Sequence, residues 1–361
     1  MRLHSLPLSL TVLVIAATPA LADTIYLIDG SQIDDCKVTT ETLLTVAYKE
    51  GNKKGEVAAD QILSIDFSKM PSLVDRAETA AEEDALLDAV ADYSEYLDGV
   101  LSRDKPPAQY KWAPAYAMYR LVELNAIMGN SAAVDSAANQ LLEKAPDSRY
   151  VPLAYLKQID ALADLQKDPT KTIEAFSELI DQKQLSQRWK LERNLAVVLY
   201  DAAVTGEARR DKLNSVARKA GTAHPLVRNR ARVAIAEAYL QENKISDAEV
   251  IFTEITDDPK ADDRTLAAAH SGRGDCLRIK AEKGGNEDKD ALKDAVLSYM
   301  RVVIVYKNEL RYAPRAMFYA GRTFDALGEE QDKAFAQKLY IKVMRSFPGS
   351  RWAKEARGFK K

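Results

Sequence analysis

Two different periods of apolar residues divide the chain. Over 24–67, short runs of apolar and β-branched residues alternate with polar ones, which predicts β-strands. Asp29-Gly30 and Glu50-Gly51-Asn52 mark tight turns between these runs. After Met70-Pro71-Ser72, the apolar residues recur at the helical period of about 3.6 and keep it to the end of the chain. We therefore expect a small all-β domain followed by a long α-helical region.

The helical region begins with an acidic stretch and continues as pairs of helices separated by short turns. The pattern over 73–101 predicts one helix, which links the β domain to the helical pairs. Its acidic residues are expected mostly to face water or a partner; they are Asp75, Glu78, Glu82, Glu83, Asp84, Asp88, Asp92, Glu95 and Asp98. From Tyr110 onward, turns rich in Gly, Pro and Asn separate helices of about 12 to 20 residues. This spacing favours about seven helical hairpins over one long coiled coil.

Three stretches of the helical region share small, aromatic and proline residues at corresponding places. The first contains Ala236, Tyr239, Ala248, Phe252 and Pro259; the second contains Gly274, Leu277, Ala295, Tyr299 and Val302; the third contains Gly321, Phe324, Ala336, Tyr340, Val343 and Pro348. This pattern resembles the tetratricopeptide repeat, whose period is about 34 residues. The resemblance covers about 225–358 well and 110–224 more loosely. It implies a mainly α fold, an α-solenoid of stacked hairpins with a concave face.

The resemblance also implies where a partner binds. In tetratricopeptide arrays the concave groove is lined by the first helix of each hairpin, and residues three, four or seven apart share one face of such a helix. The resulting partner-binding candidates are Arg230, Glu237, Ser271, Asp275, Arg278, Arg315, Phe318 and Arg322. The arginines among them can hold a carboxylate through two hydrogen bonds, for instance at the C-terminus of a peptide. The alternative is that these are ordinary solvated charges.

The β segment over 23–69 is similar to the small SH3-like or Sm-like barrels that precede repeats in exported bacterial proteins. Five short strands cannot bury much core unless the sheet curls. The segment carries five lysines and nine acidic residues. This excess of negative charge argues against a nucleic-acid surface.

The first 22 residues have the pattern of a secretory signal. Arg2 precedes an apolar run over 8–17, and Ala20-Leu21-Ala22 has the form of a cleavage site. We expect a mature chain that starts near Asp23 and is periplasmic or secreted, with no lipid anchor and no transmembrane segment. The expected organisation is a signal peptide (1–22), a β-barrel domain (23–69), a linker helix (70–109) and a repeat domain (110–361).

Overall charge and residue usage narrow the function classes. The net charge is −3, so the chain as a whole has no basic field for nucleic acid or an anionic membrane. One segment, 188–232, is basic and can meet the acidic helix, a second copy or an acidic polymer, or simply be solvated. The two cysteines, Cys36 and Cys276, are expected to be buried thiols rather than a disulfide. Neither His224 nor His270 has metal-ligand spacing, and the chain contains no phosphate-binding loop, dinucleotide fingerprint or nucleophile elbow.

These observations favour an exported scaffold or adaptor that binds proteins of the cell envelope, itself included, through its solenoid. It is expected to have no enzymatic activity, no cofactor and no metal. Two alternatives remain open. One is a cell-wall or polysaccharide-binding protein whose β-barrel is the ligand site. The other is an enzyme of unrecognised type, for which a pocket holding His224 or His270 beside an acidic residue would be the sign.

Overall fold

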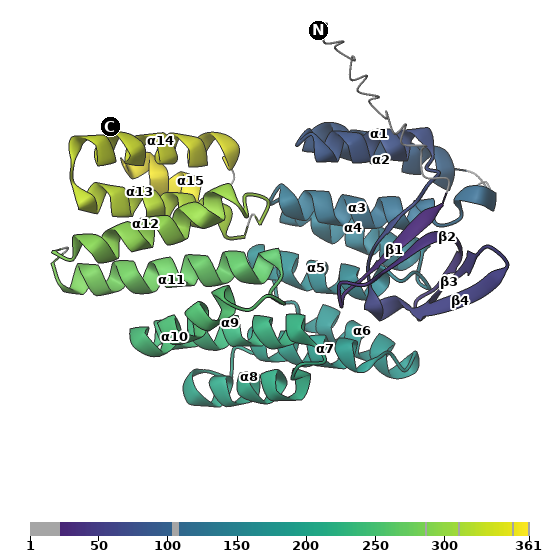
Figure 1. Cartoon of the computed structure of the whole chain (residues 1–361), viewed down its shortest axis with the longest axis horizontal. Coiled ribbons are helices and arrows are strands. Elements are labelled where there is room, and N and C mark those ends of the chain that lie inside the picture. The colour runs from purple at the N-terminus through teal and green to yellow at the C-terminus, as the bar shows by residue number, and fades with distance from the viewer. Residues whose placement is uncertain (1–21, 103–107, 286, 310, 349, 360–361) are drawn as a thin grey trace, which may run out of the picture. The chain divides into compact units, whose positions relative to one another are not determined.

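The computed structural model describes residues 22–102, 108–285, 287–309, 311–348 and 350–359. The predicted signal segment thus lies almost wholly outside the described residues. The chain forms two compact units (Figure 1). One contains the residues up to Glu41 and Thr45–Met70, and the other contains Thr42–Leu44 and Pro71–Lys361. We describe each unit by itself.

The first unit is a five-stranded antiparallel sheet with the strand order β4-β3-β2-β1-β5. The strands are β1 (Asp23–Leu27), β2 (Gln32–Glu41), β3 (Thr45–Glu50), β4 (Lys53–Ala58) and β5 (Ile62–Asp66). The turns predicted at Asp29-Gly30 and Gly51 are present, and both glycines have positive φ angles. The sheet is therefore confirmed. In the described residues β4 and β5 form its two edges, so the barrel resemblance stays a prediction.

Asp23 fastens this sheet at the start of β1. Its carboxylate is buried and accepts hydrogen bonds from the backbone N–H of Val38 at 2.8 Å and from the backbone N–H of Ser68 at 2.9 Å. The Ser68 hydroxyl donates to the same carboxylate. Ile25, Val46 and Ile65 form part of the core on the inner face of the sheet. One acidic side chain thus joins segments that are far apart in the sequence.

The second unit is an array of α-helices (Figure 1). Its described residues contain seven consecutive pairs and a short final helix. The pairs are α1 (Ser72–Glu82) with α2 (Leu86–Leu101), α3 (Ala113–Ile127) with α4 (Ser131–Lys144), α5 (Val151–Asp164) with α6 (Thr170–Gln182), α7 (Gln187–Tyr200) with α8 (Gly206–Ala220), α9 (Pro225–Gln241) with α10 (Ile245–Thr256), α11 (Asp263–Lys283) with α12 (Lys289–Ile304), and α13 (Ala313–Leu327) with α14 (Glu330–Ser346); α15 is Arg351–Ala356.

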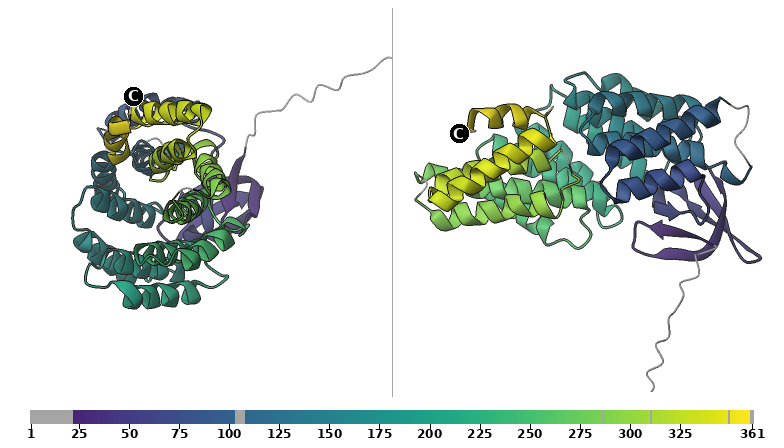
Figure 2. Two further views of the ribbon diagram at one scale, coloured as in Figure 1. Left: turned by 90° about the vertical axis from the view of Figure 1, so that its left-hand side faces the viewer. Right: turned by 90° about the horizontal axis from the view of Figure 1, so that it is seen from above.

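The packing of these helices is that of a solenoid. Consecutive helices pack against each other, and from α3 to α13 each odd-numbered helix also packs against the next odd-numbered helix. Seen end-on, the helices wind around one axis (left view of Figure 2). The predicted fold class, a solenoid of about seven hairpins after a small β domain, is confirmed. Among the described residues, no helix is long and apolar enough to cross a membrane.

The array starts earlier than the sequence predicts. The stretch expected to be one helix over 73–101 is two helices, α1 and α2, which pack as a hairpin. The chain reverses at 83–85, where Asp84 has a φ of 61°. An aspartate tolerates this left-handed conformation better than most residues, but it is a much weaker turn signal than glycine. The α2 helix also packs against α3, so the pair is the first hairpin of the array.

Glycines in the first helix of a hairpin admit aromatic rings from the second. A Cβ at Gly274 would lie 2.7 Å from the ring of Tyr299, and one at Gly321 would lie 2.6 Å from the ring of Tyr340. Both rings are fully buried. Two of the small-residue places of the repeat pattern thus lie where the two helices of a hairpin cross. The ring beside Gly321 belongs to Tyr340 on α14.

Replacing Gly274 by alanine is therefore expected to destabilise the helical unit by about 1–2 kcal/mol. The added methyl group has no room beside Tyr299, and this overpacking outweighs the better helix propensity of alanine. Gly99 in α2 has no atom within 4 Å of its missing Cβ, so Gly99→Ala should instead add up to about 1 kcal/mol. Urea unfolding followed by circular dichroism measures both. Equal changes in the two variants would contradict this account of the glycines.

Candidate functional site

Asp160 on α5 collects three donors from distant parts of the helical unit. The hydroxyl of Tyr200 on α7 donates a hydrogen bond to it at 2.7 Å. Arg264 on α11 pairs with it at 2.5 Å, and Arg311, just before α13, pairs with it at 3.5 Å. Burial alone would raise the pKa of Asp160, but the two guanidinium charges hold it well below its usual range. Arg264 and Arg311 lie 104 and 151 residues after Asp160 in the sequence, so these contacts join distant parts of the array.

Two cavities meet at this cluster. The larger, of about 370 Å³, is lined mainly by residues of α3, α4, α5, α11, α13 and α15 and of the segment before α13. The smaller, of about 60 Å³, is lined mainly by residues of α9 and α11. Asp160, Arg264 and Arg311 line both. We call the two cavities together the lumen.

Several charged side chains of the lumen make no ion pair with another described residue. In the larger cavity these are Lys157, Asp164 and Glu309, and in the smaller it is Glu237. Burial lowers the pKa of Lys157 and raises the pKa of each of the three carboxyl groups. Asp164 and Glu237 are nevertheless exposed into the lumen. These groups therefore line the lumen without an ion-pair partner among the described residues, although opposite charges further away act on each of them.

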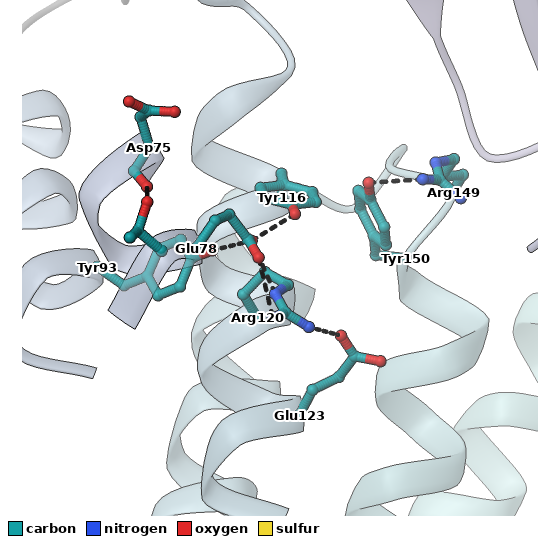
Figure 3. Close-up of polar contacts among 9 residues, drawn as sticks. Asp75, Glu78, Tyr93, Tyr116, Arg120, Glu123, Arg149 and Tyr150 are labelled. Carbon is teal, nitrogen blue, oxygen red and sulfur yellow. Dashed lines mark hydrogen bonds and ion pairs between the residues drawn. The ribbon is translucent and has the colours of Figure 1, made fainter. Parts of the chain in front are cut away.

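A second charged cluster lies around Glu78 on α1 (Figure 3). Its carboxylate accepts hydrogen bonds from the hydroxyls of Tyr93 on α2 and Tyr116 on α3. Arg120 on α3 adds two charge-assisted hydrogen bonds at 2.9 and 3.1 Å, and it also donates to Glu123 at 3.0 Å. In this cluster, unlike in the lumen, the carboxylates of Glu78 and Glu123 accept hydrogen bonds from side chains of the protein itself. We interpret this cluster as a clamp that fastens the first hairpin to α3, not as a binding site.

The structure separates the eight predicted groove residues into two sets. Two of them line the smaller cavity: Arg230, which pairs with Glu192 at 2.5 Å, and Glu237. The other six contact neighbouring helices of the array and belong to α11 and α13; they are Ser271, Asp275, Arg278, Arg315, Phe318 and Arg322.

The six residues on α11 and α13 have intramolecular partners. Arg315 donates to the Ser271 hydroxyl at 2.7 Å and pairs with Asp275, both of which are buried. Phe318 is only 2% exposed and packs in the core of the last hairpins. The guanidinium of Arg322 lies 4.7 Å from the ring of Phe359. The sixth residue, Arg278, pairs with Glu282. Partner binding by these residues stays a prediction.

The sequence did not identify the residues that dominate the lumen. Lys157, Asp160, Arg264, Glu309 and Arg311 come from three segments that are far apart in the chain. Spacing along one helix shows which residues share a face, but it does not show which hairpins meet after a superhelical turn. The available signal was weak. Lys157, Asp160 and Asp164 follow each other at intervals of three and four, which places them on one face of α5.

Of the two histidines singled out above, His270 has no hydrogen bond to an acidic side chain among the described residues. His270 on α11 is 5% exposed, its ring is stacked on Tyr306, and burial lowers its pKa to about 4. No described hydrogen bond joins it to a carboxylate. Within the described ranges, no three His, Cys, Asp or Glu residues are grouped to hold a metal ion.

Both cysteines are buried and unbonded, as predicted. Burial raises the pKa of the Cys36 thiol to about 11 and that of the Cys276 thiol to about 12. Neither thiol is therefore activated as a nucleophile at neutral pH.

Comparison with known proteins gives similarity to solved structures only. No protein-family model matches the chain, and no curated protein matches it significantly. A tetratricopeptide repeat protein from Parabacteroides merdae ATCC 43184 is 11% identical, with a TM-score of 0.43 over 80% of this chain and 96% of that one. The C-terminal part of a TPR repeat-containing protein from Cytophaga hutchinsonii is also 11% identical, with a TM-score of 0.34 over 78% and 98% of the two chains. The solenoid assignment therefore rests on the helix packing described above.

Proposed function

We propose that this protein is a non-enzymatic scaffold that binds a segment of a protein partner in its lumen. The observation that supports this most directly is the cavity of about 370 Å³ lined by residues from several different hairpins. Cavities of this size, with apolar walls and a few convergent polar groups, are typical ligand sites. Here the walls include Ile127, Val134 and Trp352, and the polar groups include Lys157 and Glu309.

We further propose that the scaffold works outside the cytoplasm, in the bacterial cell envelope. The support for export is the signal-like pattern over 1–22, which ends in Ala20-Leu21-Ala22. In this proposal the mature chain begins at Asp23, and the partners are envelope proteins or a second copy of the chain. The SH3-like or Sm-like resemblance of the β domain fits such a protein, but it names no ligand.

Photo-crosslinking in cells tests this function. A photoreactive amino acid is placed at Ser131 or Asn308, which both line the larger cavity and belong to neither charged cluster. The control positions are Asp290 and Glu330, whose side chains are 93% and 97% exposed. We expect a discrete protein adduct from the lumen positions only, recovered from the periplasmic fraction with an N-terminus at Asp23.

Two results would contradict the proposal in different ways. Adducts from Asp290 and Glu330 that equal those from Asn308 would mean that partners do not use the lumen. A chain that keeps residues 1–22 and fractionates with the cytoplasm would reject export while leaving the scaffold intact.

A further inference from the structure

The larger cavity holds opposite charges apart instead of pairing them. Lys157 lies on α5 and Glu309 in the segment between α12 and α13, and both line this cavity. The charge of Glu309 raises the pKa of Lys157, and the charge of Lys157 lowers the pKa of Glu309, as expected of opposite charges. No nitrogen–oxygen distance within 4 Å joins them, and Asp164 on the same wall is likewise without an ion pair among the described residues. All three side chains border the open volume of this cavity.

The arginines of the same cavity are already engaged. Arg264 and Arg311 both point their charge at Asp160, and Arg351 pairs with Glu355 at 2.7 Å. An acidic group of a ligand would share these guanidinium groups with a carboxylate of the protein. Lys157, Asp164 and Glu309 have no such competing ion-pair partner among the described residues. They are the groups of the larger cavity that an incoming segment can meet directly.

The adjoining small cavity contains a separate sign of an unmet polar contact. Thr265 on α11 is 1% exposed and lines this cavity. Its backbone N–H donates to the side chain of Asp262, but its hydroxyl oxygen has no hydrogen-bond partner among the described residues. A buried hydroxyl without a partner is destabilising. Because this oxygen is almost fully buried, a polar group of a ligand would reach it only if the wall of the small cavity moved.

We propose that the lumen binds a mixed-charge peptide segment, in which a basic and an acidic residue lie close together. The basic side chain meets Glu309 and Asp164, and the acidic side chain meets Lys157. This rests on the proposed function and specifies its partner class. Lys157 and Glu309 are half-buried, so charge-assisted hydrogen bonds from them to a ligand are stronger than on an open surface. The indole of Trp352 and the side chain of Pro314 supply apolar wall for the segment between the two charges.

Calorimetric titration of the full mature chain with designed peptides tests this. Three peptides of equal length share a glycine- and serine-rich frame; one carries Lys and Glu three positions apart, one carries Lys and Gln, and one carries Gln and Glu. We expect the Lys/Glu peptide to bind at least tenfold more tightly than either of the others. If a singly charged peptide binds equally well or better, the mixed-charge inference is wrong, while binding in the lumen still stands. The inference is also wrong if none of the three binds.

Substitutions in the protein assign each charge to its partner. Lys157→Gln should weaken the Lys/Glu peptide about fivefold or more and leave the Lys/Gln peptide unchanged. Glu309→Gln should weaken the Lys/Glu peptide by a similar factor and leave the Gln/Glu peptide unchanged. Together the protein variants and the peptides form double-mutant cycles, which isolate each pairwise interaction from any loss of stability. The matched control is Asp290→Asn with Lys293→Gln, an exposed pair on α12.

The control separates local contacts from the overall field. It removes the same types of charge outside the lumen, so we expect less than a twofold effect on all three peptides. Equal weakening by the control and the lumen variants, or losses that do not depend on which peptide charge is removed, would overturn the assignment.

Discussion

Replacing Glu78 by alanine is expected to lower the free energy of unfolding by about 3–4 kcal/mol. Its carboxylate is 19% exposed and accepts hydrogen bonds from Tyr93, Tyr116 and Arg120. Alanine would deprive the part-buried guanidinium of its main counter-charge and both hydroxyls of an acceptor. Removing one partner of a buried ion pair costs about 3–5 kcal/mol. Because these contacts join α1 to α2 and α3, the loss should appear first as opening of the first hairpin.

Hydrogen exchange and urea unfolding measure this effect. Amides of α1 should lose protection before those of α11, because the first hairpin stands at the end of the array and packs on the next hairpin through α2 and α3, while its ion pair from Asp84 to Lys307 is about half exposed. The matched control is Glu82→Ala, an exposed acidic residue on the same helix, which should change stability by less than about 0.5 kcal/mol. If Glu78→Ala behaved like the control, the cluster would not be a clamp.

The repeat architecture is visible in the sequence because it depends on local patterns. Short turns, a helical period of apolar residues and small residues opposite large ones recur at each hairpin, and each hairpin packs mainly on its neighbours. Gly274 and Gly321 show this well. Both hold the small-residue place of the repeat pattern, and both lie against a buried tyrosine of the next helix.

The two charged clusters could not be predicted from the sequence, because they depend on contacts between distant segments and not on local patterns. Glu78 is one of nine acidic residues in 73–101, and nothing in that run distinguishes it from its solvated neighbours. Its partner Arg120 lies 42 residues away. The break at Asp84 was missed because an acidic residue, not a glycine, takes the left-handed conformation. Contacts between distant hairpins depend on superhelical geometry, which adds up small rotations that no single repeat encodes.

Asp160 makes this array differ from a simple linear solenoid. In a linear solenoid each repeat contacts only its neighbours, and stability is a sum of repeat and interface terms. The pairs from Arg264 and Arg311 to Asp160 connect the α5/α6 hairpin directly to α11 and to the segment before α13. Lys307, after α12, pairs with Asp84 between α1 and α2 and closes the same turn. These contacts couple repeats that would otherwise unfold separately.

Replacing Asp160 by alanine is therefore expected to cost about 3 kcal/mol and to reduce the cooperativity of unfolding. Arg264, a quarter exposed, would lose its counter-charge, and the Tyr200 hydroxyl would lose its acceptor. The contribution of Arg311 is smaller because its side chain is 46% exposed. With the link removed, urea unfolding should broaden or split into two transitions, and small-angle scattering should show a larger radius of gyration.

Asp164 provides the matched control for this experiment. It lies one turn further along α5, lines the same cavity and makes no ion pair with a described residue. Asp164→Ala should therefore leave both the unfolding transition and the radius of gyration unchanged. A single, equally sharp transition in Asp160→Ala, with an unchanged radius of gyration, would show that neighbour contacts alone hold the array closed. If instead the array opens, the cavity of about 370 Å³ depends on this ion cluster. Asp160 would then control access to the proposed peptide site.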